Sequence, residues 1–192
     1  FTETDKDPDL ALSAPFPITR KSFFRKVVRD LSGLTGYRRY SQALLSIFKT
    51  EGNNTLDKIK KIWLKIHGFL ITNALIFGGV SIFLDWTLFF LLWWLPAFTY
   101  YSLIIRIRNI AEHCVTSGST DFDNTRTTLT NPIVRFLMAP HRVNYHLEHH
   151  LFIMCPWYNL PKAHSMMIEN GYKDKMCIAK SYRSVLMKAV SA

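Results

Sequence analysis

Hydrophobic positions along the chain form first a helical stripe and then two long runs. In residues 20–32, apolar side chains such as Phe23, Val27 and Leu31 recur on one helical face, with Lys and Arg beside them. This pattern predicts an amphipathic helix that lies on a membrane surface. An ordinary surface helix of a soluble protein is the alternative interpretation.

The two runs, residues 66–84 and 86–105, are each long enough to cross a hydrocarbon layer of about 30 Å. Asp85 separates them and marks the turn of a predicted transmembrane hairpin. Basic residues gather at the two outer ends, at residues 58–65 and just after residue 105, and none lies at the turn. The positive-inside rule therefore places both outer ends, and everything after Arg106, in the cytoplasm. Two buried helices of a soluble bundle are the alternative.

The rest of the chain predicts shorter elements. We expect an extended segment at 1–19, a polar loop at 115–131, a short interfacial helix at 132–138, a helix of roughly 141–154 between Pro140 and Pro156, and a mixed, helix-compatible tail at 161–191. The predicted fold class is all-α: an integral membrane helical bundle in one domain, residues 1–192. It has a hairpin at about 66–105, interfacial amphipathic helices and a cytoplasmic histidine-rich cap at about 106–192.

Composition narrows the choice of partner. The 192 residues carry a formal net charge of +10, which suits either nucleic acid or an anionic membrane face. The apolar runs favour membrane lipid, and no nucleic-acid partner is expected. The three cysteines, at irregular spacing, predict reduced thiols rather than a disulfide framework.

A histidine cluster carries the candidate chemistry. In His146-Leu147-Glu148-His149-His150, the three imidazoles stand at positions i, i+3 and i+4, which share a face of a helix. Imidazole is a ligand for Zn, Cu, Fe and Ni, so the cluster predicts a metal site. A solvated or hydrogen-bonded histidine patch is the alternative.

A second group lies where the second run passes its basic flank. Asn109 and His113 are i and i+4 on one helical face, on the same predicted side of the membrane as the cluster. An iron site of two His and one carboxylate stays open, with Glu112 or Glu148 as the carboxylate. Glu148 points off the histidine face, which favours a role in orienting an imidazole proton. No residue stands out as a general base.

These motifs resemble the membrane-bound fatty acid desaturases and hydroxylases, over essentially the whole chain. The HxxHH cluster, after Asn144 and Tyr145, looks like the last histidine box of that family, and residues 109–113 are similar to the NxxxH box of its acyl desaturases. Residues 1–8 are similar to the stretch after the second box. Residues 156–161 and His164 resemble the segment after the last box.

The resemblance implies a non-haem diiron site that oxidises fatty acyl chains with O2 as co-substrate, by desaturation or hydroxylation. By this resemblance the iron ligands are His113, His146, His149 and His150, with Asn109 acting through water and His164 and His141 as further candidates. It implies an acyl lipid as substrate (acyl-CoA, acyl carrier protein or glycerolipid) and a redox protein as electron donor. His67, at the start of a predicted membrane helix, is expected to be structural.

Two departures from the family pattern keep alternatives open. The first two boxes would lie before Phe1, and Ile153 stands where most members have Pro. Four imidazoles are too few for two irons, so this polypeptide alone is expected to be inactive. A catalytically incompetent truncated membrane module is one alternative. A zinc-dependent membrane hydrolase using Glu148 is the other, although the H-E-x-x-H order is missing.

Overall fold

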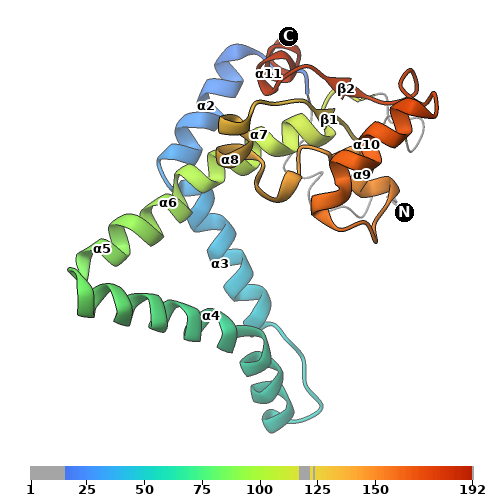
Figure 1. Ribbon diagram of the computed structural model, residues 1–192. Helices are drawn as coiled ribbons and strands as arrows, with labels where there is room; N and C mark the ends of the chain where they lie inside the picture. The colour runs from blue at the N-terminus through green and yellow to red at the C-terminus, as the bar shows by residue number, and fades with distance from the viewer. Residues whose placement is uncertain (1–15, 117–121, 123, 192) are drawn as a thin grey trace. The chain divides into compact units, whose positions relative to one another are not determined.

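The computed structural model describes residues 16–116, 122 and 124–191, and these are mostly helical (Figure 1). The expectation for residues 1–15, and part of the polar loop at 115–131, lies outside the described residues. The chain divides into two compact units. Unit 1 combines residues 1–25 with residues 104–192, and unit 2 is residues 26–103.

The elements follow one another with short connections. They are α2 (Arg20–Leu31), α3 (Leu34–Phe48), α4 (Thr55–Phe83), α5 (Thr87–Phe89), the π-helix η1 (Phe90–Trp94), α6 (Leu95–Phe98), α7 (Tyr100–His113), β1 (Thr127–Thr128), α8 (Pro132–Met138), the 3-10 helix η2 (Pro140–Arg142), α9 (His146–Leu151), the 3-10 helix η3 (Trp157–Asn159), α10 (Leu160–Glu169), β2 (Ile178–Ala179) and α11 (Tyr182–Ala189). The predicted helices at 20–32 and 132–138 thus correspond to α2 and α8.

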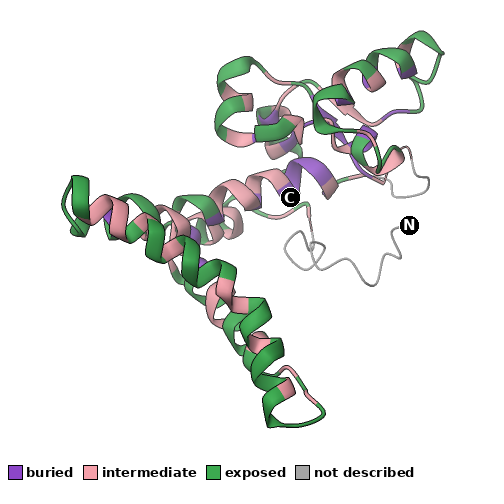
Figure 2. Cartoon of the chain, turned by 60° about the horizontal axis from the view of Figure 1, so that its bottom comes forward, coloured by how far each residue is buried: buried purple, intermediate pink, exposed green. Residues whose placement is uncertain are grey.

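Two stretches are long and apolar enough to cross a membrane, Thr55–Phe83 and Thr87–His113. The first begins at Asn54, whose side chain accepts a hydrogen bond from the backbone N–H of Asp57 at 2.8 Å. It therefore starts before residue 66, the predicted boundary, and includes the basic stretch. Figure 2 shows α4 largely exposed, and none of its most apolar 18-residue window is buried in the structure.

The second candidate span is interrupted, whereas the sequence predicted one continuous run. Pro96 lies in the turn that follows η1 and has no backbone N–H to donate along the helix. Local widening to a π-helix is a common response to such a break. Asn73 accepts a hydrogen bond from Trp93 Nε1 at 3.1 Å, which ties this interrupted stretch to α4.

Close packing in unit 2 occurs where α3 meets α6. A Cβ on Gly36 would lie 2.3 Å from the carbonyl oxygen of Phe98, closer than real Cβ atoms approach. Next to this contact, Tyr40 packs edge-on against the rings of Trp94 and Phe98. Position 36 therefore requires glycine because of the neighbouring backbone, and its φ is not in the left-handed region.

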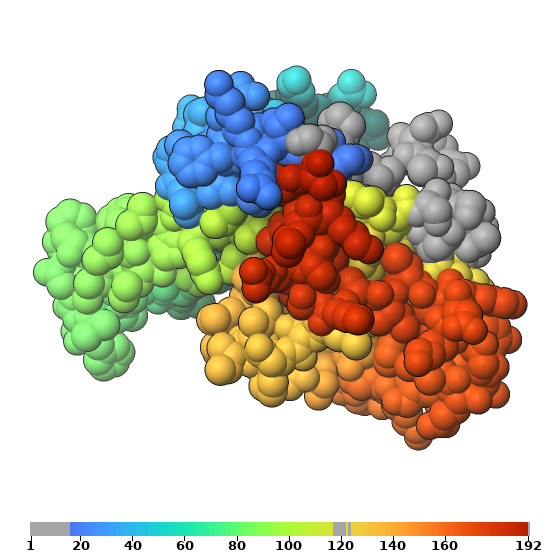
Figure 3. Space-filling model, turned by 90° about the horizontal axis from the view of Figure 1, so that it is seen from above, coloured from blue at the N-terminus to red at the C-terminus, as the bar shows by residue number. Residues whose placement is uncertain are grey.

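Unit 1 has three small buried clusters. One joins α7 to α11 through Ile110, Cys114, Val185 and Ala189, and Phe23 packs against it. In Figure 3, α11 (red) accordingly lies against the blue beginning of the described chain. The other two clusters form around Ala111, Ala139 and Tyr182, and around Leu147, Met167 and Met176.

A short parallel pairing, Thr127 with Ile178 and Thr128 with Ala179, joins β1 to β2. The sequence did not predict it. The prediction of a helix over 141–154 was wrong: the α-helix there is only His146–Leu151. His141 and Arg142 have φ values of 54° and 59°, which a right-handed helix excludes. The backbone of Asn144 and Tyr145 instead pairs with β1, so the helix begins after them.

Replacing Gly36 with Ala is expected to lower the stability of the purified protein in detergent. The added methyl would meet the backbone of Phe98, and overpacking of this kind costs about 1–3 kcal/mol. Gly79→Ala on α4 is the matched control, since a Cβ there meets nothing within 4 Å and a helical Gly→Ala change is favourable by about 0.5–1 kcal/mol. Thermal unfolding midpoints measure both changes. Equal midpoints for the two variants would contradict the close approach of α3 and α6.

Candidate metal centre

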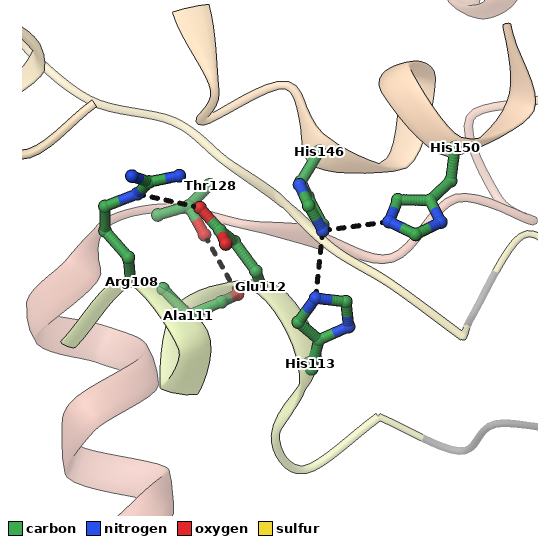
Figure 4. A network of polar contacts seen from close by, with 7 residues as sticks. All are labelled: Arg108, Ala111, Glu112, His113, Thr128, His146 and His150. Atoms are coloured by element: carbon green, nitrogen blue, oxygen red, sulfur yellow. Dashed lines mark hydrogen bonds and ion pairs between the residues drawn. The ribbon is translucent and has the colours of Figure 1, made fainter. Parts of the chain in front are cut away.

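Three imidazoles meet at one point in unit 1. The Nε2 atom of His146 lies 3.0 Å from Nε2 of His113 and 3.0 Å from Nε2 of His150 (Figure 4). One ring nitrogen from each of the three residues lies within 4.8 Å of the other two. Imidazole nitrogens gathered at this spacing form a donor set that a metal ion can share.

The local folds explain why these three side chains meet. His146 and His150 are i and i+4 on α9, so they project from one face. His113 is the last residue of α7, 33 positions earlier in the chain. Figure 4 shows it pointing toward His146 from the opposite side. The group therefore depends on how the end of α7 is held against the beginning of α9.

The surroundings of His146 keep its ring neutral. Burial lowers the pKa of His146 well below its usual range, and the neighbouring imidazoles of His113 and His150 lower this pKa further. The neutral imidazole is the form that binds metals. Nearby on α7, Arg108 Nε lies 3.2 Å from Oε1 of the buried Glu112, so the charge of that carboxylate is compensated.

The other sequence candidates lie around this group in different ways. His149 is exposed, and its ring centroid is 6.0 Å from that of His146 and 5.9 Å from that of His150. His141 is exposed and packs edge-on against Trp157, with 5.2 Å between ring centroids. Neither residue belongs to the set of three nitrogens. His67, in unit 2, has Nδ1 2.9 Å from the carbonyl oxygen of Trp63.

Glu148 occupies the opposite face of α9 and is completely buried. One carboxylate oxygen lies 2.5 Å from Nδ1 of His164 on α10, and the other accepts a hydrogen bond from Thr127 Oγ1. The sequence predicted that Glu148 orients an imidazole proton. The imidazole that it contacts is that of His164, which is also buried.

Asn109 stands one turn before His113 and is buried. Its Nδ2 atom has no hydrogen-bond partner among the described residues. Buried amide donors are nearly always paired with protein or ordered water, so this atom is a position where a bound water fits. The donor set and this unsatisfied amide both fit the metal group that the sequence predicted, with Asn109 acting through water.

Sequence analysis missed a group of polar residues that support the three histidines. Arg126, Thr127, Thr128 and Asn144 are all buried, and they connect α7 to α9. The only signal in the sequence is an unusual run, Thr125 to Thr128, of residues compatible with a strand. A two-residue strand is shorter than the strands that a sequence pattern can identify.

The model of the fatty acid desaturase family matches residues 1–180. The chain belongs to the fatty acid desaturase family. No curated protein and no solved structure gives a significant match. Membership implies an oxidoreductase that acts on lipid acyl chains in a membrane environment, in agreement with the two candidate spans.

Replacing His164 with Ala is expected to destabilise unit 1. The change leaves the buried carboxylate of Glu148 without its closest partner, and breaking a buried pair in this way costs about 3–5 kcal/mol. His141→Ala is the control, because an exposed side chain of this kind contributes about 0.5 kcal/mol or less. Hydrogen exchange of α9 and α10 amides measures the difference. Similar protection in both variants would show that the Glu148–His164 contact does not stabilise the fold.

Proposed function

We propose that this protein is a membrane-bound, non-haem diiron oxidase of fatty acyl chains, with desaturation as the first candidate reaction and hydroxylation as the second. The observation that carries the proposal is the meeting of His113, His146 and His150 in a chain of the fatty acid desaturase family. Iron bound at such a site supplies the oxidation of an unactivated C–H bond by O2. An acyl lipid would be the substrate, and a redox protein would deliver the electrons.

The described residues would do three things for such a site. His113, His146 and His150 would hold metal with the imidazole nitrogens that now face one another. Asn109 would hold a water with its buried amide, and Glu148 would fix the orientation of α9 through His164 and Thr127. His149 would complete the donor set with a side-chain rotation, since it is exposed and its neighbours are close.

The placement in the membrane is also part of the proposal. Thr55–Phe83 and the first two thirds of the second candidate span would cross the bilayer with Asp85 at the far turn. Lys58 to Lys65 and Arg106 with Arg108 would mark the cytoplasmic ends. The histidine group, which follows Arg108, would then lie on the cytoplasmic side close to the membrane surface.

Three histidines are also compatible with zinc, so metal identity separates the two enzyme classes. A zinc hydrolase would hold one zinc, and the proposed oxidase two irons. Three facing imidazoles, even with His149, His141 and His164 added, are few for two ions. Residues 1–192 by themselves are therefore expected to retain fewer than two irons and to be inactive.

In the full-length protein, His146→Ala is expected to remove most of the iron and nearly all product. His146 lies between the other two imidazoles and has the shortest contacts to both. His149→Ala tests the residue that only the family resemblance places in the donor set, and we expect a loss of similar size. His67→Ala, outside the group, is the control and should remain close to wild type. Iron per chain and gas chromatography of cellular lipids are the measurements.

Two results would contradict this assignment. Full iron content and product in His146→Ala would exclude the histidine group as the metal site. One zinc per wild-type chain, with no iron and no oxidised acyl product, would favour the hydrolase instead.

The orientation predicts which single-cysteine positions react from each side. With the native cysteines replaced by Ser, a cysteine at Asp85 is expected to react with a membrane-impermeant maleimide added to the outside of intact cells. A cysteine at Lys173, which is exposed, should react only after the membrane is opened. The opposite pattern would reverse the orientation, and equal reactivity of both positions in intact cells would contradict a hairpin.

A further inference from the structure

A three-residue segment, 126–128, lies between the two elements that carry the facing histidines. Arg126 is buried, and its guanidinium donates to the end of α7. Nη1 lies 3.2 Å from the carbonyl oxygen of Ala111, and Nη2 lies 2.8 Å from that of Val115. The backbone N–H of Arg126 donates to the carbonyl of Glu112 at 3.0 Å. Three hydrogen bonds from one residue thus surround His113.

The next two residues contact the element on the other side. Thr127 Oγ1 donates to the carboxylate of Glu148 on α9, and the backbone of Thr127 forms a bridge with Tyr145. The backbone N–H of Thr128 donates to Asn144 O at 2.9 Å, and Asn144 Nδ2 donates to Thr128 O at 3.2 Å. These contacts involve the residues immediately before His146 and the residue midway between His146 and His150.

The alternation of an extended segment explains how one short piece serves both elements. Successive side chains of a strand point to opposite faces, so Arg126 and Thr128 share one face and Thr127 takes the other. Thr128 Oγ1 also lies 3.5 Å from the carbonyl of Ala111, on the α7 side. The segment is itself held by the strand region of β2, since Thr127 N–H donates to Cys177 O and Leu129 N–H to Ala179 O.

The end of α7 needs such partners. The last carbonyl groups of a helix have no partner within the helix, and a cation there is favourable because of the helix dipole. Val115, two residues beyond His113, has φ of 55°, which is costly for a β-branched residue. The chain therefore leaves α7 in a conformation that other contacts must maintain, and Arg126 supplies two of them.

We propose that residues 126–128 are the positioning segment of the metal centre, with Arg126 fixing His113 and Thr127 fixing α9 through Glu148. Neither residue binds metal. Their role is to set the separation of His113 from His146 and His150 before metal arrives. The inference rests on the metal site of the proposed function and adds the residues that assemble it.

The test measures cobalt(II), used as a spectroscopic probe, in the full-length protein purified in detergent. Thr127→Val removes the hydroxyl at almost constant volume. It is expected to weaken cobalt affinity about 10–100-fold, the usual effect of losing a group that orients metal ligands, and to change the visible d–d spectrum. Thr127→Ser keeps the hydroxyl and should restore both. Thr130→Val, two residues beyond the segment, is the matched control.

A second variant covers the case in which Thr127→Val does not fold. Arg126→Lys keeps the charge but loses the fork that spans two carbonyl groups, so it should weaken cobalt binding and alter the spectrum in the same direction. Arg183→Lys, exposed on α11, is its control.

The possible results separate the two proposals. Wild-type spectra and affinity in Thr127→Val and Arg126→Lys, or a lower melting temperature with an unchanged spectrum, would overturn the positioning role. Failure of both variants to fold would overturn it too, since the segment would then be needed for the fold as a whole. A wild-type protein that retains neither cobalt nor iron would instead overturn the metal site, and the positioning role with it.

Discussion

The described half of the metal centre depends on the fact that the last turn of α7 and the first turn of α9 are bonded to the same short strand. His113 and His146 are separated by 33 positions, and neither helix alone could bring their nitrogens to 3.0 Å. Backbone hydrogen bonds from Arg126 and Thr128, together with the Thr127–Glu148 contact, connect the two ends directly. The positions of the imidazoles are thus set by buried polar contacts and not by the small apolar clusters around them.

This arrangement places a buried carboxylate at the centre of the support. Glu148 is fully buried and satisfied on both oxygens, by His164 and by Thr127. A charge in such a place is tolerated only with good partners, and a fully satisfied network rigidifies what it touches. Because Glu148 stands between His146 and His150 on α9, it fixes the rotation of that short helix. It therefore links β1 and α10 to the direction in which the two imidazoles point.

Local patterns in the sequence predicted what local physics decides. The stripe in α2 and the proline that opens α8 gave boundaries close to those observed, and the i, i+4 spacing placed His146 and His150 on one face. The helix at 141–154 was wrong because Asn144 and Tyr145 pair with β1, a contact distant in sequence that no helical periodicity contains. His149 shows the same limit: a six-residue helix offers one turn and a half, so its rotation is decided by Glu148 and the residues around it.

The two units also differ in the solvent that their surfaces require. In unit 2, apolar side chains such as Leu75, Ile82 and Phe83 are more than two-thirds exposed, which water would penalise and lipid would not. In unit 1, the residues around the histidines bury polar groups against one another. An oxidation of apolar chains needs both environments close together in sequence, because the substrate is soluble in lipid whereas metal ligands need hydrogen-bonded support. The chain changes from one to the other along α7, between the apolar Leu103 and the metal-facing His113.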